Sequence, residues 1–112
     1  MSSTIIEPGL SSGALDIHRA LASLQEELEA IDFYNQRSDV SLDGSLSAVL
    51  DHNRDDEMEH AVMLMEWLRR NMPEFDRQMG KILFKTGSIV DLAKAKIPAG
   101  NDGTGLGLGD LK

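Results

Sequence analysis

The sequence contains no cysteine, which excludes both disulfide bonds and thiolate metal sites. Any metal ion must therefore be held by carboxylate and imidazole groups. Aromatic residues make up only 4% of the chain, which is typical of helices that pack through Leu, Ile, Met and Ala. No stretch approaches the ~20 consecutive apolar residues of a membrane span, and the first residues lack the basic and apolar segments of a signal peptide. We therefore expect a cytoplasmic protein.

Positive charge is also scarce. The chain has 11 Lys and Arg residues against 19 Asp and Glu residues, so its net charge is −8 and its pI is about 4.7. Such a surface repels nucleic acid and anionic lipid and attracts cations. We therefore expect neither a nucleic-acid nor a membrane partner. The length of 112 residues suits a single domain.

The distribution of small and polar residues divides the chain into three segments. Residues 1–12 are small and polar, and we interpret them as a flexible N-terminus. Residues 13–97 carry the helical pattern and form the predicted helical hairpin domain. After Pro98 the composition shifts to Gly, Asn and Asp, so residues 98–112 are interpreted as a flexible tail.

Apolar residues recur at spacings of three and four, which predicts an all-α protein. We expect two long helices, at about 14–36 and 46–71, with Ser45 as a possible N-cap of the second. Their short connection predicts an antiparallel hairpin. A shorter helix is expected at about 73–84, and residues 88–96 could form a last short one.

Two ionisable residues, Glu57 and His60, lie on the apolar stripe of the expected second helix, which carries no Lys or Arg. Burying an ionised carboxylate alone costs several kcal/mol, so Glu57 needs a counter-charge or a metal ion. The i, i+3 spacing puts both groups on one helical face, as in the Glu-x-x-His motif of di-iron carboxylate bundles. The whole stripe comprises Leu46, Val49, Leu50, Asn53, Glu57, His60, Ala61, Leu64, Trp67 and Leu68.

The first helix offers a third ligand, Glu27, at the edge of its own apolar stripe, with Tyr34 two turns further on. Carboxylates with one imidazole per metal suit iron or manganese better than a closed zinc site. A di-iron site of this type needs two copies of the three ligands. One hairpin supplies only one copy, so we expect a second chain to supply the other across a two-fold axis. The alternative is a buried polar network in which His60 bonds Glu57 or Asn53.

A second apolar line, formed by Met58, Val62 and Met65, lies on another face of the second helix. Either a neighbouring chain or the third helix could cover it. The remaining histidines, His18 and His52, lie off the main stripe and are interpreted as ordinary surface or boundary residues.

Two segments of the sequence resemble the encapsulated ferritins, a two-helix ferritin family that is packaged inside encapsulin nanocompartments. The segments read LQEELEAIDFYNQR, from Leu24 to Arg37, and HNRDDEMEHAVMLMEWLRR, from His52 to Arg70. The resemblance covers roughly residues 15 to 90. One departure is Phe33, where members of the family have Trp, and it should affect packing more than chemistry.

The resemblance implies half of a ferritin-like four-helix bundle, completed by dimerisation, with a ferroxidase centre between two chains. Each chain would contribute Glu27, Glu57 and His60 as ligands of iron, two ions per dimer. Tyr34 would place its hydroxyl beside the centre. Two further acidic residues would guide Fe(II) towards it, Glu26 and Glu29.

The resemblance also implies partners. The family assembles as a ring of five dimers, a homodecamer, and passes oxidised iron to the encapsulin lumen. The spacing of Leu106, Leu108 and Leu111 resembles the targeting peptides that dock on the inner wall of the shell. We therefore expect a ferroxidase that serves iron storage inside this compartment. The alternatives are a non-enzymatic helical oligomer that is carried as cargo, and a di-metal peroxidase or oxidase.

Overall fold

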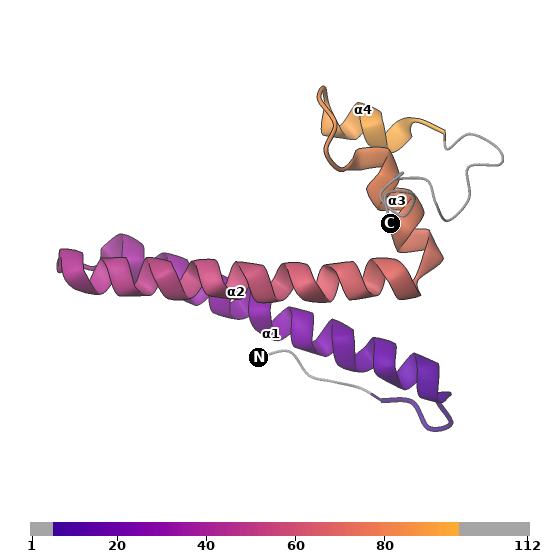
Figure 1. The fold of residues 1–112 in the computed structure, drawn as a ribbon, viewed down its shortest axis with the longest axis horizontal. Coiled ribbons are helices and arrows are strands. Elements are labelled where there is room, and N and C mark those ends of the chain that lie inside the picture. The colour runs from indigo at the N-terminus through magenta and orange to yellow at the C-terminus, as the bar shows by residue number, and fades with distance from the viewer. Residues whose placement is uncertain (1–5, 97–112) are drawn as a thin grey trace. The chain divides into compact units, whose positions relative to one another are not determined.

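The computed structural model describes residues 6–96, a range that is mostly helical and contains no strand. The helices are α1 (Ser12–Val40), α2 (Gly44–Asn71), α3 (Pro73–Ile82) and α4 (Ile89–Lys94) (Figure 1). The chain forms two compact units that divide between Trp67 and Leu68, inside α2. The prediction of an all-α chain with two long helices and shorter C-terminal ones is confirmed. Within the described range, no helix is both long and apolar enough to cross a membrane.

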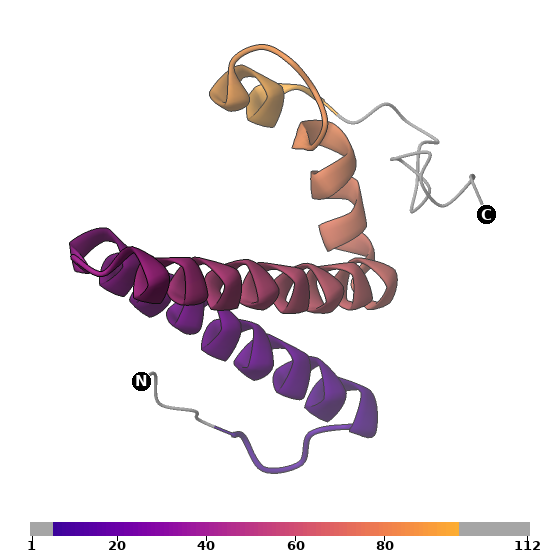
Figure 2. The ribbon, with the colours of Figure 1, turned by 60° about the vertical axis from the view of Figure 1, so that its left-hand side comes forward.

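The first unit is an antiparallel hairpin of α1 and α2. In both views the helices lie side by side near their connection and move apart towards the start of α1 (Figures 1 and 2). The Ser11 hydroxyl caps α1 by accepting a hydrogen bond from the backbone N–H of Ala14 at 3.1 Å. Four residues more than expected are helical at the end of α1, where Ser38 bonds to the facing helix α2.

The connection is short, and Asp43 ends it. One carboxylate oxygen of Asp43 accepts hydrogen bonds from the backbone N–H groups of Ser45, at 2.9 Å, and Leu46, at 3.1 Å. Asp43 therefore satisfies the free donors at the start of α2, which is the role of an N-cap. The prediction that Ser45 caps this helix is wrong by two residues, because the helix begins earlier, at Gly44.

Little of the hairpin is fully buried. Within residues 6–67, Ala61 is the single buried apolar residue, at 2% exposure, and the other apolar positions are half-buried or exposed. Large exposed side chains include Leu28 at 47% on α1, and Val49 at 53% and Val62 at 59% on α2. Burial of apolar surface is the main stabilising term in folding, so a hairpin with this exposure gains stability from a further apolar partner.

The second unit contains the end of α2 together with α3 and α4. Pro73 occupies the first turn of α3, where its missing N–H costs nothing. The guanidinium of Arg69 binds the carboxylate of Asp76 at 2.6 Å, and both side chains are almost fully buried. Helix α3 ends two residues earlier than expected, and Phe84 follows it in the left-handed conformation, with φ 59°. The hydroxyl of Ser88 then caps α4.

Candidate metal centre

Three predicted ligands, Glu27, Glu57 and His60, come together between α1 and α2. Nδ1 of His60 lies 3.0 Å from Oε1 of Glu57 and 3.5 Å from Oε1 of Glu27. One ligand atom from each residue lies within 4.8 Å of the others. Two carboxylates and one imidazole at this separation can converge on one cation, and this donor set suits iron or manganese.

The i, i+3 spacing of α2 accounts for one contact of the cluster, and the pairing of the helices accounts for the other. Glu57 and His60 are one turn apart on the same face of α2. Glu27 reaches them from α1 because the hairpin is antiparallel and its two long helices are in register at this level.

The cluster lies at the surface of the single chain. The side chains of Glu27 and Glu57 are 25% and 24% exposed, whereas that of His60 is 51% exposed. The expectation that the α2 stripe would be buried inward is therefore wrong for His60 within one hairpin. Other residues of the α2 stripe differ in exposure: Val49 is 53% exposed, whereas Ala61, next to His60, is 2% exposed.

The three groups change one another's affinity for protons. The hydrogen bond to Glu57 raises the pKa of the His60 imidazolium above its ordinary value, and the nearby charge of Glu27 acts in the same direction. The two carboxyl groups share a hydrogen bond, which raises the pKa of Glu27 and lowers the pKa of Glu57. Where His60 is protonated, a cation must displace that proton before the imidazole can bind it.

The polar-network interpretation also finds its expected contact, because His60 bonds Glu57. Of the other histidines, His52 lies 3.3 Å from Asp56, one turn along α2, and is largely exposed. His18 is half-buried on α1. Neither belongs to a metal-binding cluster in the described range.

The other predicted site residues lie on α1, outside the triad. Glu26 is exposed and Glu29 is half-buried. Tyr34 is half-buried, and the guanidinium of Arg37 lies 5.8 Å from the centre of its ring. A rise of about 1.5 Å per residue places Tyr34 roughly 10 Å along the helix from Glu27. The predicted targeting residues Leu106, Leu108 and Leu111 lie outside the described residues.

A hairpin of two long helices that gathers carboxylates and an imidazole on one side corresponds to half of a ferritin-like bundle. The family model described as EncFtn-like matches residues 5–86. Because this match spans most of the chain, the protein belongs to the EncFtn-like family.

Individual relatives agree with this assignment. A ferritin-like protein from Thermotoga maritima is 46% identical over 97 residues, covering 87% of this chain and 84% of the relative. An encapsulated ferritin-like protein from Rhodospirillum rubrum is 43% identical over an alignment of 117 positions, covering 92% of this chain and 82% of the relative. A crystal structure of a protein from Nitrosomonas europaea matches with a TM-score of 0.74 and 49% identity, covering 78% of this chain and 98% of that one.

Proposed function

We propose that this protein is a ferroxidase, which oxidises Fe(II) to Fe(III) at a di-iron centre formed between two copies of the chain. The observation that carries the proposal is the convergence of Glu27, Glu57 and His60 on one side of a helical hairpin. Membership of a ferritin-like family supports iron as the substrate metal. The set of oxygen and nitrogen ligands agrees with iron.

Two copies are needed because one chain supplies only half of the ligands. Di-iron bundles take two carboxylates and two Glu-x-x-His pairs from four helices, whereas one hairpin offers Glu27 and a single pair, Glu57 with His60. The exposed apolar residues on the same hairpin, including Val49 and Leu28, favour a second hairpin as the partner. Facing copies would bury these side chains and place both ligand sets around one pair of iron ions.

The main role of the protein in this reaction is to hold two iron ions close together. Each Fe(II) gives up one electron, so a pair of ions can reduce one dioxygen to hydrogen peroxide, or one peroxide to water, with two protons taken up. The carboxylates of Glu27 and Glu57 balance the charge of the ions. Glu26 and Glu29 draw Fe(II) in by their negative potential, and Tyr34 would place its hydroxyl beside the centre.

Variants of α2 test this function. We expect Glu57→Gln and His60→Ala to slow iron oxidation by about ten-fold or more, since each removes a metal ligand. Glu59→Gln and His52→Ala are matched controls on the same helix, outside the cluster, and should keep the wild-type rate. The measurement is the formation of Fe(III) under air, followed by absorbance. Wild-type rates in both Glu57→Gln and His60→Ala would contradict the assignment.

The bond between His60 and Glu57, at 3.0 Å, also suits a second function, that of a non-enzymatic helical oligomer carried as cargo. Metal analysis after anaerobic loading with Fe(II) separates the two functions, because a purely structural pair would bind no stoichiometric iron. A di-metal peroxidase or oxidase would consume peroxide without accumulating oxidised iron. Comparing iron turnover with peroxide consumption therefore tests that third possibility.

We further propose that the protein acts inside an encapsulin compartment in the cytoplasm, as a ring of five dimers. The name of the Rhodospirillum rubrum relative supports encapsulation. Leu106, Leu108 and Leu111 would dock on the shell. Co-expression with an encapsulin tests this role, because a chain truncated after residue 104 should no longer be packaged. Equal packaging of the truncated chain would refute the role of the tail.

A further inference from the structure

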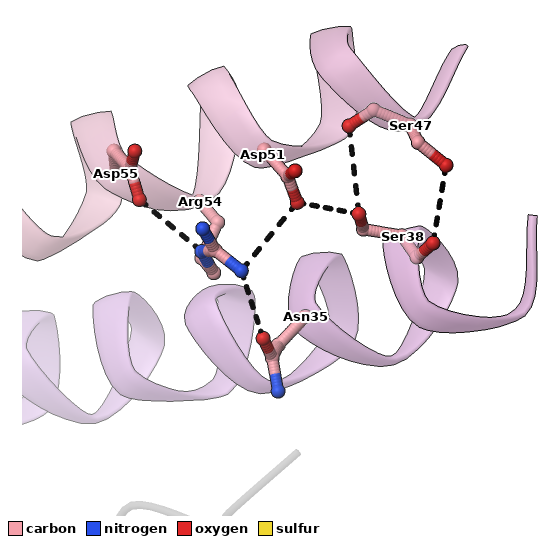
Figure 3. Close-up of polar contacts among 6 residues, drawn as sticks. All are labelled: Asn35, Ser38, Ser47, Asp51, Arg54 and Asp55. Atoms are coloured by element: carbon pink, nitrogen blue, oxygen red, sulfur yellow. Dashed lines mark hydrogen bonds and ion pairs between the residues drawn. The ribbon is translucent and has the colours of Figure 1, made fainter. Parts of the chain in front are cut away.

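A group of polar side chains joins α1 to α2 near the hairpin connection (Figure 3). We call the group the hairpin clasp, and it consists of Asn35, Ser38, Ser47, Asp51 and Arg54. Ser38 donates from its hydroxyl to the carboxylate of Asp51, and the Ser47 hydroxyl donates to the Ser38 carbonyl at 3.1 Å. One turn further from the connection, Nη1 of Arg54 donates to Oδ1 of Asn35 at 3.0 Å.

Arg54 is the centre of the clasp. Its guanidinium contacts Asn35 on α1 and two carboxylates of its own helix, those of Asp51 at 3.4 Å and Asp55 at 3.2 Å. Asp51 in turn accepts the hydroxyl of Ser38 from α1. The contacts therefore link both helices at two successive levels, and Figure 3 shows them as one connected chain.

Apolar packing alone specifies the alignment of these helices weakly. Ala61 is the single fully buried apolar residue within residues 6–67, so few interlocking side chains resist sliding of α1 along α2. A slip of one residue moves a helix by about 1.5 Å along its axis. Metal–ligand distances tolerate only about 0.2 Å, so such a slip would separate Glu27 from Glu57 and His60.

The clasp and the candidate metal centre are on the same helix pair. Starting from the contact of Asn35 with Arg54, eight residues back along α1 lead to Glu27, and six residues onward along α2 lead to His60. Both helices are continuous over these spans. An alignment that is set at the clasp is therefore transmitted to the three ligands.

We propose that Arg54 and Asn35 are positioning residues for the metal centre, because their contact sets the register of α1 against α2 and so the distance of Glu27 from Glu57 and His60. The inference rests on the metal centre of the proposed function. Neither Arg54 nor Asn35 is a metal ligand. The hairpin clasp affects the metal centre by fixing how α1 is aligned with α2.

Arg54 also carries a positive charge near the candidate metal centre, and its loss has an effect of its own on cation binding. Replacing Arg54 with Gln removes a positive charge one turn before Glu57, so electrostatics alone would strengthen cation binding. Loss of the alignment between α1 and α2 would instead weaken cation binding. Asn35→Ala removes the facing acceptor without changing any charge, and alanine is the better helix former. Asn35→Ala should therefore weaken metal binding through geometry alone, and Arg54→Gln should weaken it in spite of the favourable change in charge.

The experiment is an anaerobic titration of the full chain with Co(II), read out as affinity and as the visible spectrum of the bound ion. We expect Asn35→Ala and Arg54→Gln to weaken Co(II) binding about ten-fold, the lower end of what loss of a ligand-supporting partner costs, and to alter the spectrum. The matched control is Arg19→Gln. Among the described residues Arg19 pairs with Asp16 of its own helix, at 2.8 Å, and with no residue of α2, so its loss should leave both readouts unchanged.

The possible outcomes decide between the two proposals. Wild-type affinity and spectrum in both clasp variants would overturn the positioning role, and the proposed function would stand. Tighter binding by Arg54→Gln would mean that Arg54 acts by charge, which also overturns it. A loss of affinity that parallels a loss of helicity in the same metal-free variant would assign the clasp to folding alone. Absence of Co(II) binding by the wild-type chain would refute the metal centre itself, and the positioning role with it.

Discussion

At the residue scale, His60 couples the candidate centre to pH. Its hydrogen bond to Glu57 raises its pKa above the ordinary value of 6.5, so the imidazole stays protonated to a higher pH than a free histidine. A metal ion binds only the neutral ring. We therefore expect the affinity for Co(II) to be full above the raised pKa and to fall by about ten-fold per pH unit below it, for each proton displaced. Anaerobic titrations at a series of pH values measure this dependence.

The proton on His60 has the opposite effect on the metal-free fold. A raised pKa means that the bond to Glu57 stabilises the hairpin below the unfolded pKa, and that this contribution is lost as the pH rises through the folded pKa. An NMR titration of His60 in the metal-free chain gives the pKa directly, and Glu57→Gln should lower it. A pKa of His60 at or below 6.5 in the wild type would contradict both expectations.

Contacts within one helix could be predicted from the sequence, whereas most contacts between the two helices could not. The pairing of Glu57 with His60 was predictable, because it depends only on the i, i+3 spacing of one helix. The nearness of Glu27 was predicted from its place on a neighbouring stripe, but its 3.5 Å contact required the helices to be paired. Arg54 and Asn35 were missed, since both read as ordinary polar helix positions until the two helices are aligned.

At the scale of elements, α3 carries two acidic residues with arginine partners in different surroundings. Asp76 and Arg69 are almost fully buried, at 4% and 10% side-chain exposure, whereas Glu74 and Arg77 are an exposed pair. We expect Asp76→Ala to lower the free energy of unfolding by about 3 kcal/mol, because it removes one partner of a charge pair that is shielded from water. Urea unfolding of the metal-free chain, followed by circular dichroism at fixed concentration, measures the loss.

Glu74→Ala is the matched comparison for that variant. It removes an acid from the same helical turn, but water screens the pair that is lost, so its effect should be much smaller. Equal losses in the two variants would mean that burial does not determine the strength of the Arg69–Asp76 pair.

The elements themselves were predicted well in type and less well at their ends. All four helices occur near the expected positions, the two long ones where the apolar periodicity places them. The end of α1 was missed because Ser38 gains partners on α2, and the start of α2 was misassigned because Asp43 competes with Ser45 for the cap. Both errors come from hydrogen bonds that local propensity does not reveal.

At the scale of the whole molecule, the proposed dimer should respond to metal. Two facing clusters bring the carboxylates of Glu27 and Glu57 from both chains together, and their repulsion opposes pairing until cations neutralise it. We expect anaerobic Fe(II) to shift the wild-type chain from smaller to larger assemblies, measured by light scattering after size exclusion. Glu57→Gln should respond less than Glu59→Gln, since the former lacks a ligand. The same size distribution with and without Fe(II) would count against a metal-bridged interface.

The amino-acid sequence alone establishes the helical class, the absence of thiolate chemistry, and the placement of a carboxylate and an imidazole one turn apart. These properties depend on composition and on periodicity within one helix, which are local. The folded hairpin was needed to show that Glu27 joins the pair, that His60 faces outward from a single hairpin, and that the hairpin clasp links α1 to α2. Those features depend on the alignment of two separate helices, and that alignment arises from contacts that only form when both helices are in place.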